Sequence, residues 1–165
     1  MAPSESANSC VAEERKMHVS MEPVTADSRE RFMEMAEAHF RELNPAFIPQ
    51  EDWSECYFER IVANAAFSLR WVVVDGRRCG FILFGREDHR FLPRQVGAIY
   101  ELYVERQYRK QGIARACAFQ AIRELQAVSP SKVQLEFMNG NTAAEKLWSS
   151  LGFHKVSERW VLGEQ

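Results

Sequence analysis

The feature that most constrains the fold is a junction where a strand-like segment passes directly into a helix-like one. Residues 98–105 are rich in apolar and aromatic side chains, and the helix-like run after the junction lasts until Ser129. A glycine at such a junction lets the backbone approach a ligand closely, and the amides of the first helical turn point toward that ligand. The junction therefore predicts a phosphate-binding turn. Its motif is Arg109-Lys110-Gln111-Gly112-Ile113-Ala114.

The charges in and beside this motif agree with a phosphate site without deciding the question. Arg109, Lys110 and Arg115 would surround a bound pyrophosphate with positive charge. A helix start with a solvated basic first turn has the same composition. Both interpretations stay open on these residues alone, and the rest of the chain has to decide between them.

The composition indicates one globular domain. The chain has 165 residues, of which 46% are hydrophobic, which suffices for one well-buried core and is short for two. A net charge of -2 argues against a general nucleic-acid or anionic-membrane binder. The four cysteines lie far apart, with no Cys-x-x-Cys pair and no nearby histidine cluster. We therefore expect no metal site and a reducing compartment.

The N-terminal part of the chain differs in composition from the rest. Residues 1–16 are rich in Ser, Ala and Glu without apolar periodicity, which predicts a flexible extension before a single domain at 17–165. Met17 is an alternative to Met1 as the natural start. No apolar stretch approaches the roughly 20 residues of a membrane span, and the N-terminus has no apolar signal core. We expect a cytoplasmic protein that does not enter the membrane.

Apolar periodicity and turn residues divide the domain into alternating elements. The order is strand, two helices, three strands, helix, strand, helix, strand, which predicts a mixed sheet with helices on both faces. Asp75-Gly76 marks a hairpin, and a polar loop is expected over residues 86–95. The expected strands are 18–24, 69–74, 79–85, 98–105, 133–137 and 154–162, and the expected helices are 27–44, 51–64, 113–128 and 142–151.

Local signals mark the ends of two of these helices. Asp27 and Glu30 have the spacing of a capping box at the start of the first helix. Asn141 or Thr142 caps the last helix, Thr142 and Glu145 have the same box spacing, and Gly152 ends that helix as a left-handed cap.

Two charged or titratable side chains fall among apolar ones. His39 lies on the apolar face of the first helix, and we interpret it as a packed residue rather than a catalytic one. In the strand before the motif, Tyr100, Leu102 and Val104 alternate with Ile99, Glu101 and Tyr103, as in a central strand that is apolar on both faces. Glu101 is then a carboxylate in a mostly apolar setting, where it holds a proton more readily than in water.

Two motifs together resemble one family. Leu102-Tyr103-Val104, Tyr108 and the run Arg109 to Ala114 resemble the acetyl-CoA-binding signature of the GNAT superfamily of acyl-CoA N-acyltransferases. Asn141 to Trp148, continued by Gly152-Phe153, is similar to the second motif of that family. The resemblance implies a single α/β domain with a mixed, mostly antiparallel sheet, splayed central strands and helices on both faces.

The resemblance also implies roles for individual residues on the donor side. The amides of Gln111 to Ala114 would hold the pyrophosphate of acetyl-CoA, and the backbones of Leu102 and Val104 would pair with its pantetheine arm. The Val104 amide would face the thioester oxygen and stabilise the oxyanion. Asn141 and Trp148 would lie along the same arm near the sulfur. Asn141 is equally suited to cap a helix, and Trp148 to fill the core.

Attack on a thioester requires a neutral amine, so a site of this kind has to take up a proton. Glu101 is the best candidate for a base or amine anchor, although a structural carboxylate bonded to a helix is an equal alternative. Tyr100 and Tyr103 are adjacent candidates, expected on opposite faces. Many members of the family have a tyrosine acid at the position of Trp148, and an indole cannot protonate a thiolate. Another hydroxyl or water does so, or no acid is needed, or turnover is slow.

The resemblance favours an N-acetyltransferase that moves an acetyl group from acetyl-CoA to a primary amine of a small molecule or peptide. The alternative is a non-catalytic or regulatory acyl-CoA-binding module. We expect residues 44–53, residues 86–95 and the tail after Phe153 to build the acceptor pocket. Nearby Glu51, Asp52 and Glu55 favour a cationic amine such as a polyamine, an aminoglycoside or a lysine-like side chain. Because the family often dimerises, a homodimer is compatible with the resemblance.

Overall fold

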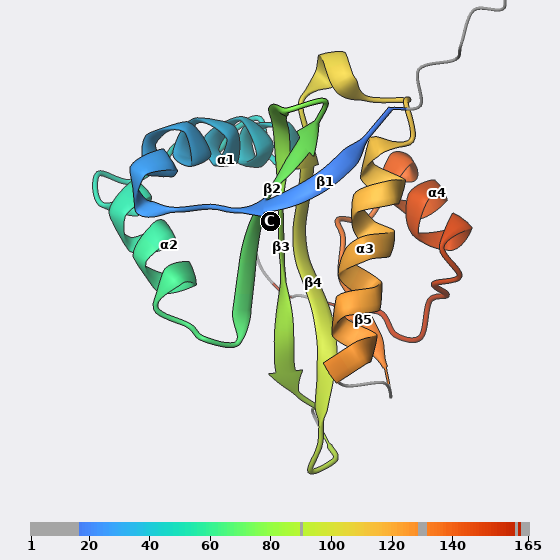
Figure 1. Ribbon diagram of the computed structural model, residues 1–165. Helices are drawn as coiled ribbons and strands as arrows, with labels where there is room; N and C mark the ends of the chain where they lie inside the picture. The colour runs from blue at the N-terminus through green and yellow to red at the C-terminus, as the bar shows by residue number, and fades with distance from the viewer. Residues whose placement is uncertain (1–16, 90, 129–131, 161, 163–165) are drawn as a thin grey trace, which may run out of the picture.

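The computed structural model describes residues 17–89, 91–128, 132–160 and 162. The extension expected over residues 1–16 lies outside these ranges. The described chain forms a sheet between two layers of helices (Figure 1).

The sheet has five strands in the order in which they occur along the chain. Neighbouring strands are antiparallel except the last pair, which is parallel. The mixed, mostly antiparallel sheet is therefore confirmed. Its strands are β1 (Val19–Pro23), β2 (Phe67–Val74), β3 (Arg77–Asp88), β4 (Gln95–Val104) and β5 (Val133–Leu135).

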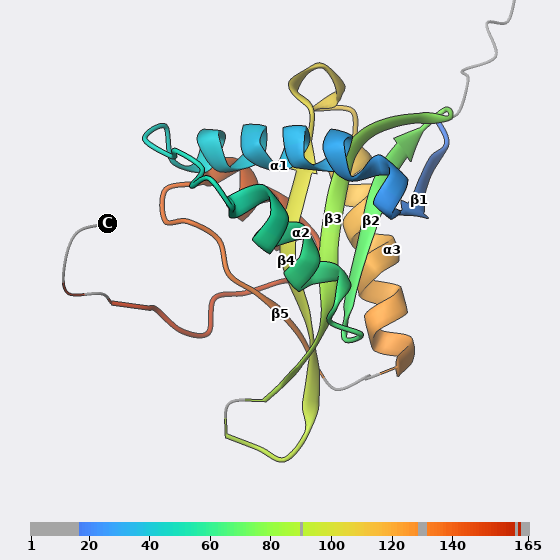
Figure 2. The same cartoon turned by 90° about the vertical axis from the view of Figure 1, so that its left-hand side faces the viewer.

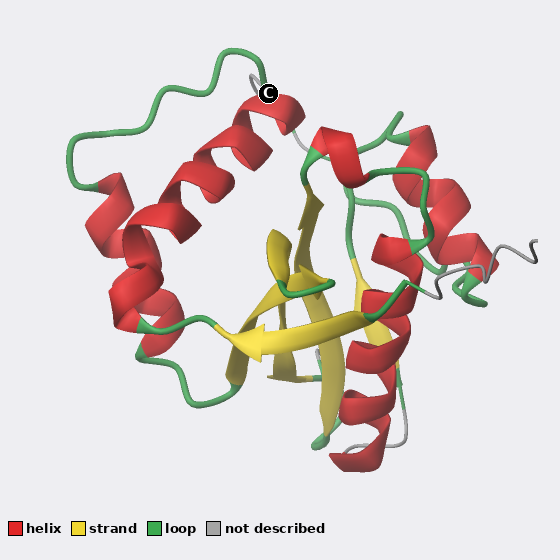
Figure 3. Cartoon of the chain, turned by 45° about the horizontal axis from the view of Figure 1, so that its top comes forward, coloured by secondary structure: helices red, strands yellow, loops and turns green. Residues whose placement is uncertain are grey.

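Helices cover both faces of the sheet, as Figures 2 and 3 show. On one face lie α1 (Arg29–Leu43) and α2 (Trp53–Val62), and on the other lie α3 (Ile113–Val128) and α4 (Thr142–Ser150). Each layer buries its own apolar cluster, since a side chain on a strand can reach only one face. The α1/α2 cluster includes Phe32, Phe58, Trp71, Phe81 and Tyr103. The α3/α4 cluster includes Ile82, Val104, Ile113, Cys117 and Trp148.

The first helix begins later than the sequence indicated. Residues 26–28 form a short 3-10 turn, and the capping box belongs to Thr25 and Ser28, with the Thr25 amide donating to Ser28 Oγ at 3.2 Å. The box expected from Asp27 and Glu30 was therefore wrong. Thr25 precedes the turn in extended backbone, which leaves its amide available to a side chain three residues on.

The hairpin at Asp75-Gly76 is confirmed. Both residues have positive φ, 47° and 79°, as a type I′ turn requires. The strands that follow are longer than expected, because β3 continues to Asp88 and β4 begins at Gln95. The loop between them is correspondingly shorter than 86–95.

The strand expected over residues 154–162 was wrong for the residues that can be described. Residues 153–160 follow α4 without strand pairing, and Val156 and Trp160 are 70% and 88% exposed. The tail contacts the sheet end through an exposed ion pair between Arg159 and Glu136, 3.1 Å apart. Alternating apolar residues form a strand only where a neighbouring edge can bury them, and β5 is a strand of just three residues.

A bulge interrupts β4 in the middle of the sheet. Glu101 pairs with Leu83 and Ile99 pairs with Phe84, so Tyr100 is an extra residue without its own partner on β3. Consequently Tyr100 packs in the α1/α2 cluster, and Glu101 contacts His39 of the same helical layer. The alternation that placed Tyr100 with Leu102, and opposite Tyr103, was wrong because a bulge shifts the phase by one residue.

Gly80 allows β3 to approach β4 closely near the end of β4. It pairs with Val104, and a Cβ at its position would lie 2.0 Å from the Tyr103 carbonyl oxygen. We expect Gly80→Ala to lower the free energy of unfolding by about 2 kcal/mol, because the strands must separate to admit a methyl group. Urea unfolding measures the change.

A matched control for this substitution is Gly76→Ala. Gly76 has φ +79°, but nothing lies within 4 Å of a Cβ there, so only backbone strain of roughly 1 kcal/mol is expected. If Gly80→Ala costs no more than Gly76→Ala, the close approach of the two strands is not a constraint.

Candidate active site

The sheet opens between β4 and β5. Their ladder contains the pairs Gly97–Val133, Ala98–Gln134 and Ile99–Leu135, and ends there, although β4 continues to Val104. Within the described residues no strand pairs with the outer edge of β4 after Ile99. The splay that the family resemblance implied is therefore present.

The bulge decides which backbone groups face this open edge. Before it, the Gly97 amide donates to Lys132 next to β5 at 2.9 Å. After it, the Glu105 amide donates to Cys79 of β3 at 2.8 Å. Because the amide and carbonyl of one residue point the same way and neighbours alternate, the polar groups of Leu102 and Val104 point to the open edge. These are the two residues proposed to pair with a pantetheine arm.

The turn after β4 presents the N-terminus of a long helix. Gly112 has φ +79° and its carbonyl accepts the amide of Ala116 at 3.0 Å, so α3 starts directly after this glycine. The amides of Ile113, Ala114 and Arg115 precede any intrahelical acceptor and lie at the positive end of a 16-residue helix. Lys110 and Gln111 are exposed at the same turn. This geometry suits an anion.

Arg109 of the motif is turned away from this helix end. Its Nε donates to the Val104 carbonyl at 2.6 Å, and its guanidinium pairs with Glu42 of α1 at 2.9 Å and lies over the Tyr103 ring. Burial raises the pKa of Glu42, but hydrogen bonds from Arg109 and Arg106 outweigh it and leave that pKa lowered. The pair therefore stabilises the fold above the usual carboxylate range and is lost as pH falls through the lowered pKa.

The other two expected cations differ in placement. The Arg115 guanidinium donates to the Ser150 carbonyl at 3.2 Å, so it binds the last turn of α4. Lys110 has φ +61° and is exposed, with no ion pair to the described residues. Of the three cations, Lys110 is therefore the one whose charge remains at the turn.

The second motif forms α4 and its two caps. Asn141 is the N-cap, and its side-chain oxygen accepts the Ala144 amide at 3.0 Å. Trp148 is buried, 7% exposed, and packs edge-to-face on Phe153. Gly152 has φ +90°, and the Phe153 amide donates to the Trp148 carbonyl, which confirms the expected left-handed cap. Capping and core packing account for the contacts that Asn141 and Trp148 make with the rest of the chain.

Glu101 is bonded to a neighbouring helix, as in the structural alternative considered for it, although the sequence did not indicate which residue is the partner. His39 Nε2 lies 2.6 Å from Glu101 Oε2, across the boundary between α1 and β4. His39 was interpreted as a packed histidine and is indeed 9% exposed, but it is also an ion-pair or hydrogen-bond partner of the candidate base. The position of His39 on the apolar face of α1 was the available signal, since a buried histidine needs a polar partner.

The two tyrosines beside Glu101 are engaged elsewhere. Tyr100 donates to Glu87 at 3.3 Å, and burial together with Glu87 raises its pKa to about 12. Burial, followed by the charge of Glu42, raises the pKa of Tyr103, whose ring lies between His39 and Arg109. Both hydroxyls thus hold their protons more tightly than a tyrosine in water.

Comparison with known families identifies the family to which this chain belongs. The sequence profile of the acetyltransferase (GNAT) family matches residues 30–153, about three quarters of the chain. The chain belongs to the GNAT acetyltransferase family. The matched range contains the open edge of β4, the Gly112 turn and the whole of α4. No curated protein matches the chain in sequence.

Solved structures with the same fold are distant in sequence from this GNAT protein. Ribosomal-protein-alanine N-acetyltransferase from Brucella melitensis biovar Abortus 2308 is 17% identical with a TM-score of 0.66, over 90% of this chain and 99% of that one. Aminoglycoside N-acetyltransferase AAC(6')-Iy in complex with CoA is also 17% identical, with a TM-score of 0.70 over 92% and 97%. A transcriptional regulator from Bacillus halodurans C-125 reaches a TM-score of 0.73 at 17% identity, over 89% and 100%. These likenesses establish the fold.

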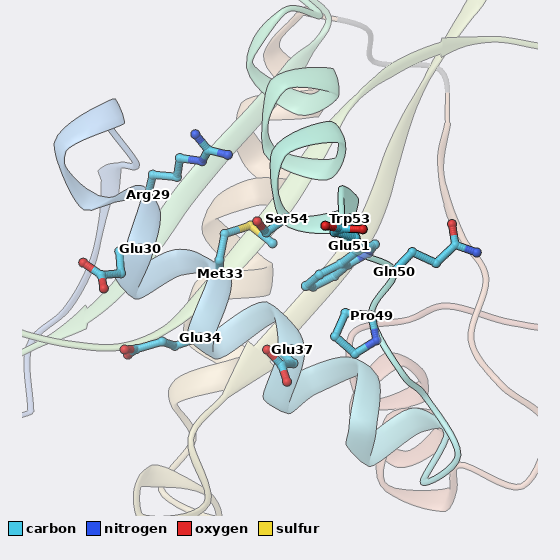
Figure 4. A pocket seen from close by; sticks show the side chains of 10 residues that line it. All are labelled: Arg29, Glu30, Met33, Glu34, Glu37, Pro49, Gln50, Glu51, Trp53 and Ser54. Carbon is cyan, nitrogen blue, oxygen red and sulfur yellow. The ribbon is translucent and has the colours of Figure 1, made fainter.

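A groove of about 520 Å³ lies between α1 and the start of α2, and its lining residues all come from α1 and the segment around the start of α2 (Figure 4). Four of its lining residues are glutamates and one is an arginine, which gives it net negative charge. Of the segments expected to line an acceptor pocket, only residues 49–53 contribute to it. The lining residues are Arg29, Glu30, Met33, Glu34, Glu37, Pro49, Gln50, Glu51, Trp53 and Ser54.

Among the described residues no helix is long and apolar enough to cross a membrane. The same ranges contain no group of three or more His, Cys, Asp or Glu side chains that could hold a metal ion.

Tyr57 of α2 carries a buried hydroxyl that has no hydrogen-bond partner within the described chain. Burial, followed by the charge of Glu101, raises its pKa. We expect Tyr57→Phe to leave the free energy of unfolding unchanged or to raise it by up to about 1 kcal/mol, because it removes an unsatisfied polar atom and keeps the stacked ring. Urea unfolding tests this, and a loss of stability would show that the hydroxyl is satisfied in the folded protein.

Proposed function

We propose that this GNAT protein is an N-acetyltransferase that moves an acetyl group from acetyl-CoA to a primary amine of a small molecule or peptide. The observation that carries the proposal is one continuous segment, residues 101–114. It presents a carboxylate, an open strand edge and a helix N-terminus in that order. A thioester donor with a long amide-containing arm and a pyrophosphate has matching chemistry along its length.

The donor would lie along β4 and end at the turn. The polar groups of Leu102 and the carbonyl of Val104 at the open edge pair with the amides of the pantetheine arm, as an added strand does. The Val104 carbonyl accepts from Arg109 with one lone pair and keeps the other for the arm, and the Val104 amide stabilises an oxyanion at the thioester. The amides of Gln111 to Ala114, with Lys110, bind the pyrophosphate.

The acceptor side needs one proton acceptor. Glu101 takes the proton of the attacking amine, directly or through a water, and the nitrogen then attacks the thioester carbonyl. A thiol of ordinary pKa, about 8.5, leaves readily as a thiolate. Because Trp148 is buried and the hydroxyls of Tyr100 and Tyr103 hold their protons tightly, we propose that solvent protonates the thiolate.

The charge near α1 and α2 supports a cationic acceptor. The groove beside Trp53 has four carboxylates against one guanidinium, and such a field concentrates cations. Several of the structural relatives are named as aminoglycoside acetyltransferases, which accords with a polycationic amine. A polyamine or lysine-like side chain fits the same chemistry.

The test is release of free thiol from acetyl-CoA in the presence of a panel of amines, with products weighed for one added acetyl group. We expect amine-dependent thiol release, strongest with polycationic amines. Tight binding of acetyl-CoA without release for any amine would overturn the enzyme proposal in favour of an acyl-CoA-binding regulator. The indole at position 148 is the observation that favours that second function.

A further inference from the structure

The carboxylate of Glu101 is held by a histidine from another layer of the fold. His39 projects from α1 onto β4, and its Nε2 lies 2.6 Å from Glu101 Oε2. Three aromatic rings surround the imidazole, with centroids 5.5 Å away for Phe40, 5.8 Å for Phe81 and 5.5 Å for Tyr103. The ring therefore has little freedom to turn, and the direction of its Nε2 is fixed by packing.

The chemistry of the two groups fixes the direction of the hydrogen bond. A base must be ionised before it takes a proton, and an ionised carboxylate only accepts hydrogen bonds. His39 Nε2 therefore carries the hydrogen and donates it to Oε2. That contact occupies one oxygen of Glu101 and fixes the plane of the carboxylate, which leaves Oε1 as the oxygen that can face an amine.

We propose that His39 is a positioning residue that orients Glu101 for deprotonation of the acceptor amine. The inference rests on the proposed function, and it concerns a residue outside both sequence motifs. Oriented bases gain rate because the proton acceptor is already in place when the amine arrives.

In the described part of the chain, few charged or titratable groups other than His39 lie close enough to influence the Glu101 carboxylate. Among the described residues, His39 is the one ion-pair partner of Glu101. From α2 the neutral Tyr57 hydroxyl is near enough for the charge of Glu101 to raise its pKa. On β4 the hydroxyl of Tyr103, whose ring contacts His39, is influenced by Glu42, Arg109, Glu105 and Arg106. On β3 the residues facing the pair, Phe81 and Leu83, are apolar.

The test compares His39→Leu with His39→Gln, whose amide can donate from nearly the place of Nε2. For His39→Leu we expect kcat/KM for the amine to fall by on the order of 10-fold at neutral pH, with KM for acetyl-CoA unchanged. His39→Gln should restore most of the rate, because its amide can donate to the same carboxylate oxygen.

A double-variant cycle separates positioning from a general structural effect. In a Glu101→Gln background, His39→Leu should cause little further loss, since a residue that acts through Glu101 has nothing left to position. Additive losses, or a His39→Gln variant as slow as His39→Leu, would overturn the inference. Nitrogen NMR of the ring without any substrate gives an independent result, for which we expect Nε2 to be protonated in the wild type.

Different experimental results would contradict the role of His39 and the proposed function. If the wild-type protein releases thiol with an amine and His39→Leu behaves like it, only the role of His39 is lost. If the wild-type protein releases no thiol with any amine, the N-acetyltransferase proposal falls, and the positioning role falls with it.

Discussion

Replacing Glu101 with glutamine is expected to lower kcat/KM for the acceptor amine by on the order of 1000-fold. The amide keeps the size of the side chain and can still accept the hydrogen bond from His39, but it cannot take up a proton. The Kd for acetyl-CoA should not change, because the proposed donor contacts use the backbone of β4 and the helix end. Steady-state thiol release and calorimetric titration with acetyl-CoA measure the two quantities.

Glu105→Gln is the matched control for this change. Glu105 is the first residue after β4, and its carboxylate pairs with Arg31 on the surface of α1, 2.7 Å away. We expect its kcat/KM to stay within about threefold of the wild type, since an exposed pair contributes little. An acid limb of the pH–rate profile that is the same in Glu101→Gln and in the wild type would show that another group is the base.

The second large effect is expected at the turn before α3. Gly112→Glu should raise the Kd for acetyl-CoA by on the order of 100-fold, because a carboxylate would stand where the helix amides are proposed to bind the pyrophosphate. The fold should persist, since nothing lies within 4 Å of a Cβ at Gly112. The cost to stability is the strain of φ +79° on a residue with a side chain, roughly 1 kcal/mol.

Gly112→Ala separates backbone strain from charge at this position. It carries the same strain without a carboxylate, so we expect its Kd to rise by less than about tenfold. Calorimetric titration of both variants, with thermal unfolding to confirm the fold, gives the comparison. Equal affinities for the alanine and glutamate variants would contradict a pyrophosphate site at these amides.

The parts of the fold that the sequence predicted depend on neighbouring residues. The Asp75-Gly76 turn, the Gly152 cap and the passage from strand to helix at Gly112 each need a backbone conformation that few residues adopt. The apolar face of α1 follows from helical spacing alone. Such signals can be recognised from a few neighbouring residues, without knowledge of the rest of the chain.

The parts that the sequence did not predict depend on distant partners. Nothing near Tyr100 marks it as a bulge, because the bulge exists only relative to the register of β3. The pairing of His39 with Glu101 joins residues 62 positions apart. The tail at 153–160 has strand-like alternation, but no described strand lies beside it to complete a ladder. Arg109 has the charge to bind a phosphate, but its guanidinium is bonded to Glu42 and to the Val104 carbonyl.

The extra residue at Tyr100 limits how this chain can change in length. Upstream of it, odd-numbered residues of β4 direct their amides toward β5, and downstream of it even-numbered residues face the open edge. Deleting Tyr100 would join Ile99 directly to Glu101, so β4 would alternate regularly and keep both the β5 ladder and the Leu102 and Val104 edge. A one-residue insertion or deletion elsewhere in β4 would instead turn one part of the strand over and disrupt one of these edges. Residues 91–94 lie outside β3 and β4, in the connection between them, where insertions are best tolerated. Engineered insertions of a tag or binding loop therefore belong in that connection, and Tyr100 is the position of β4 at which a residue can be removed without reversing the strand.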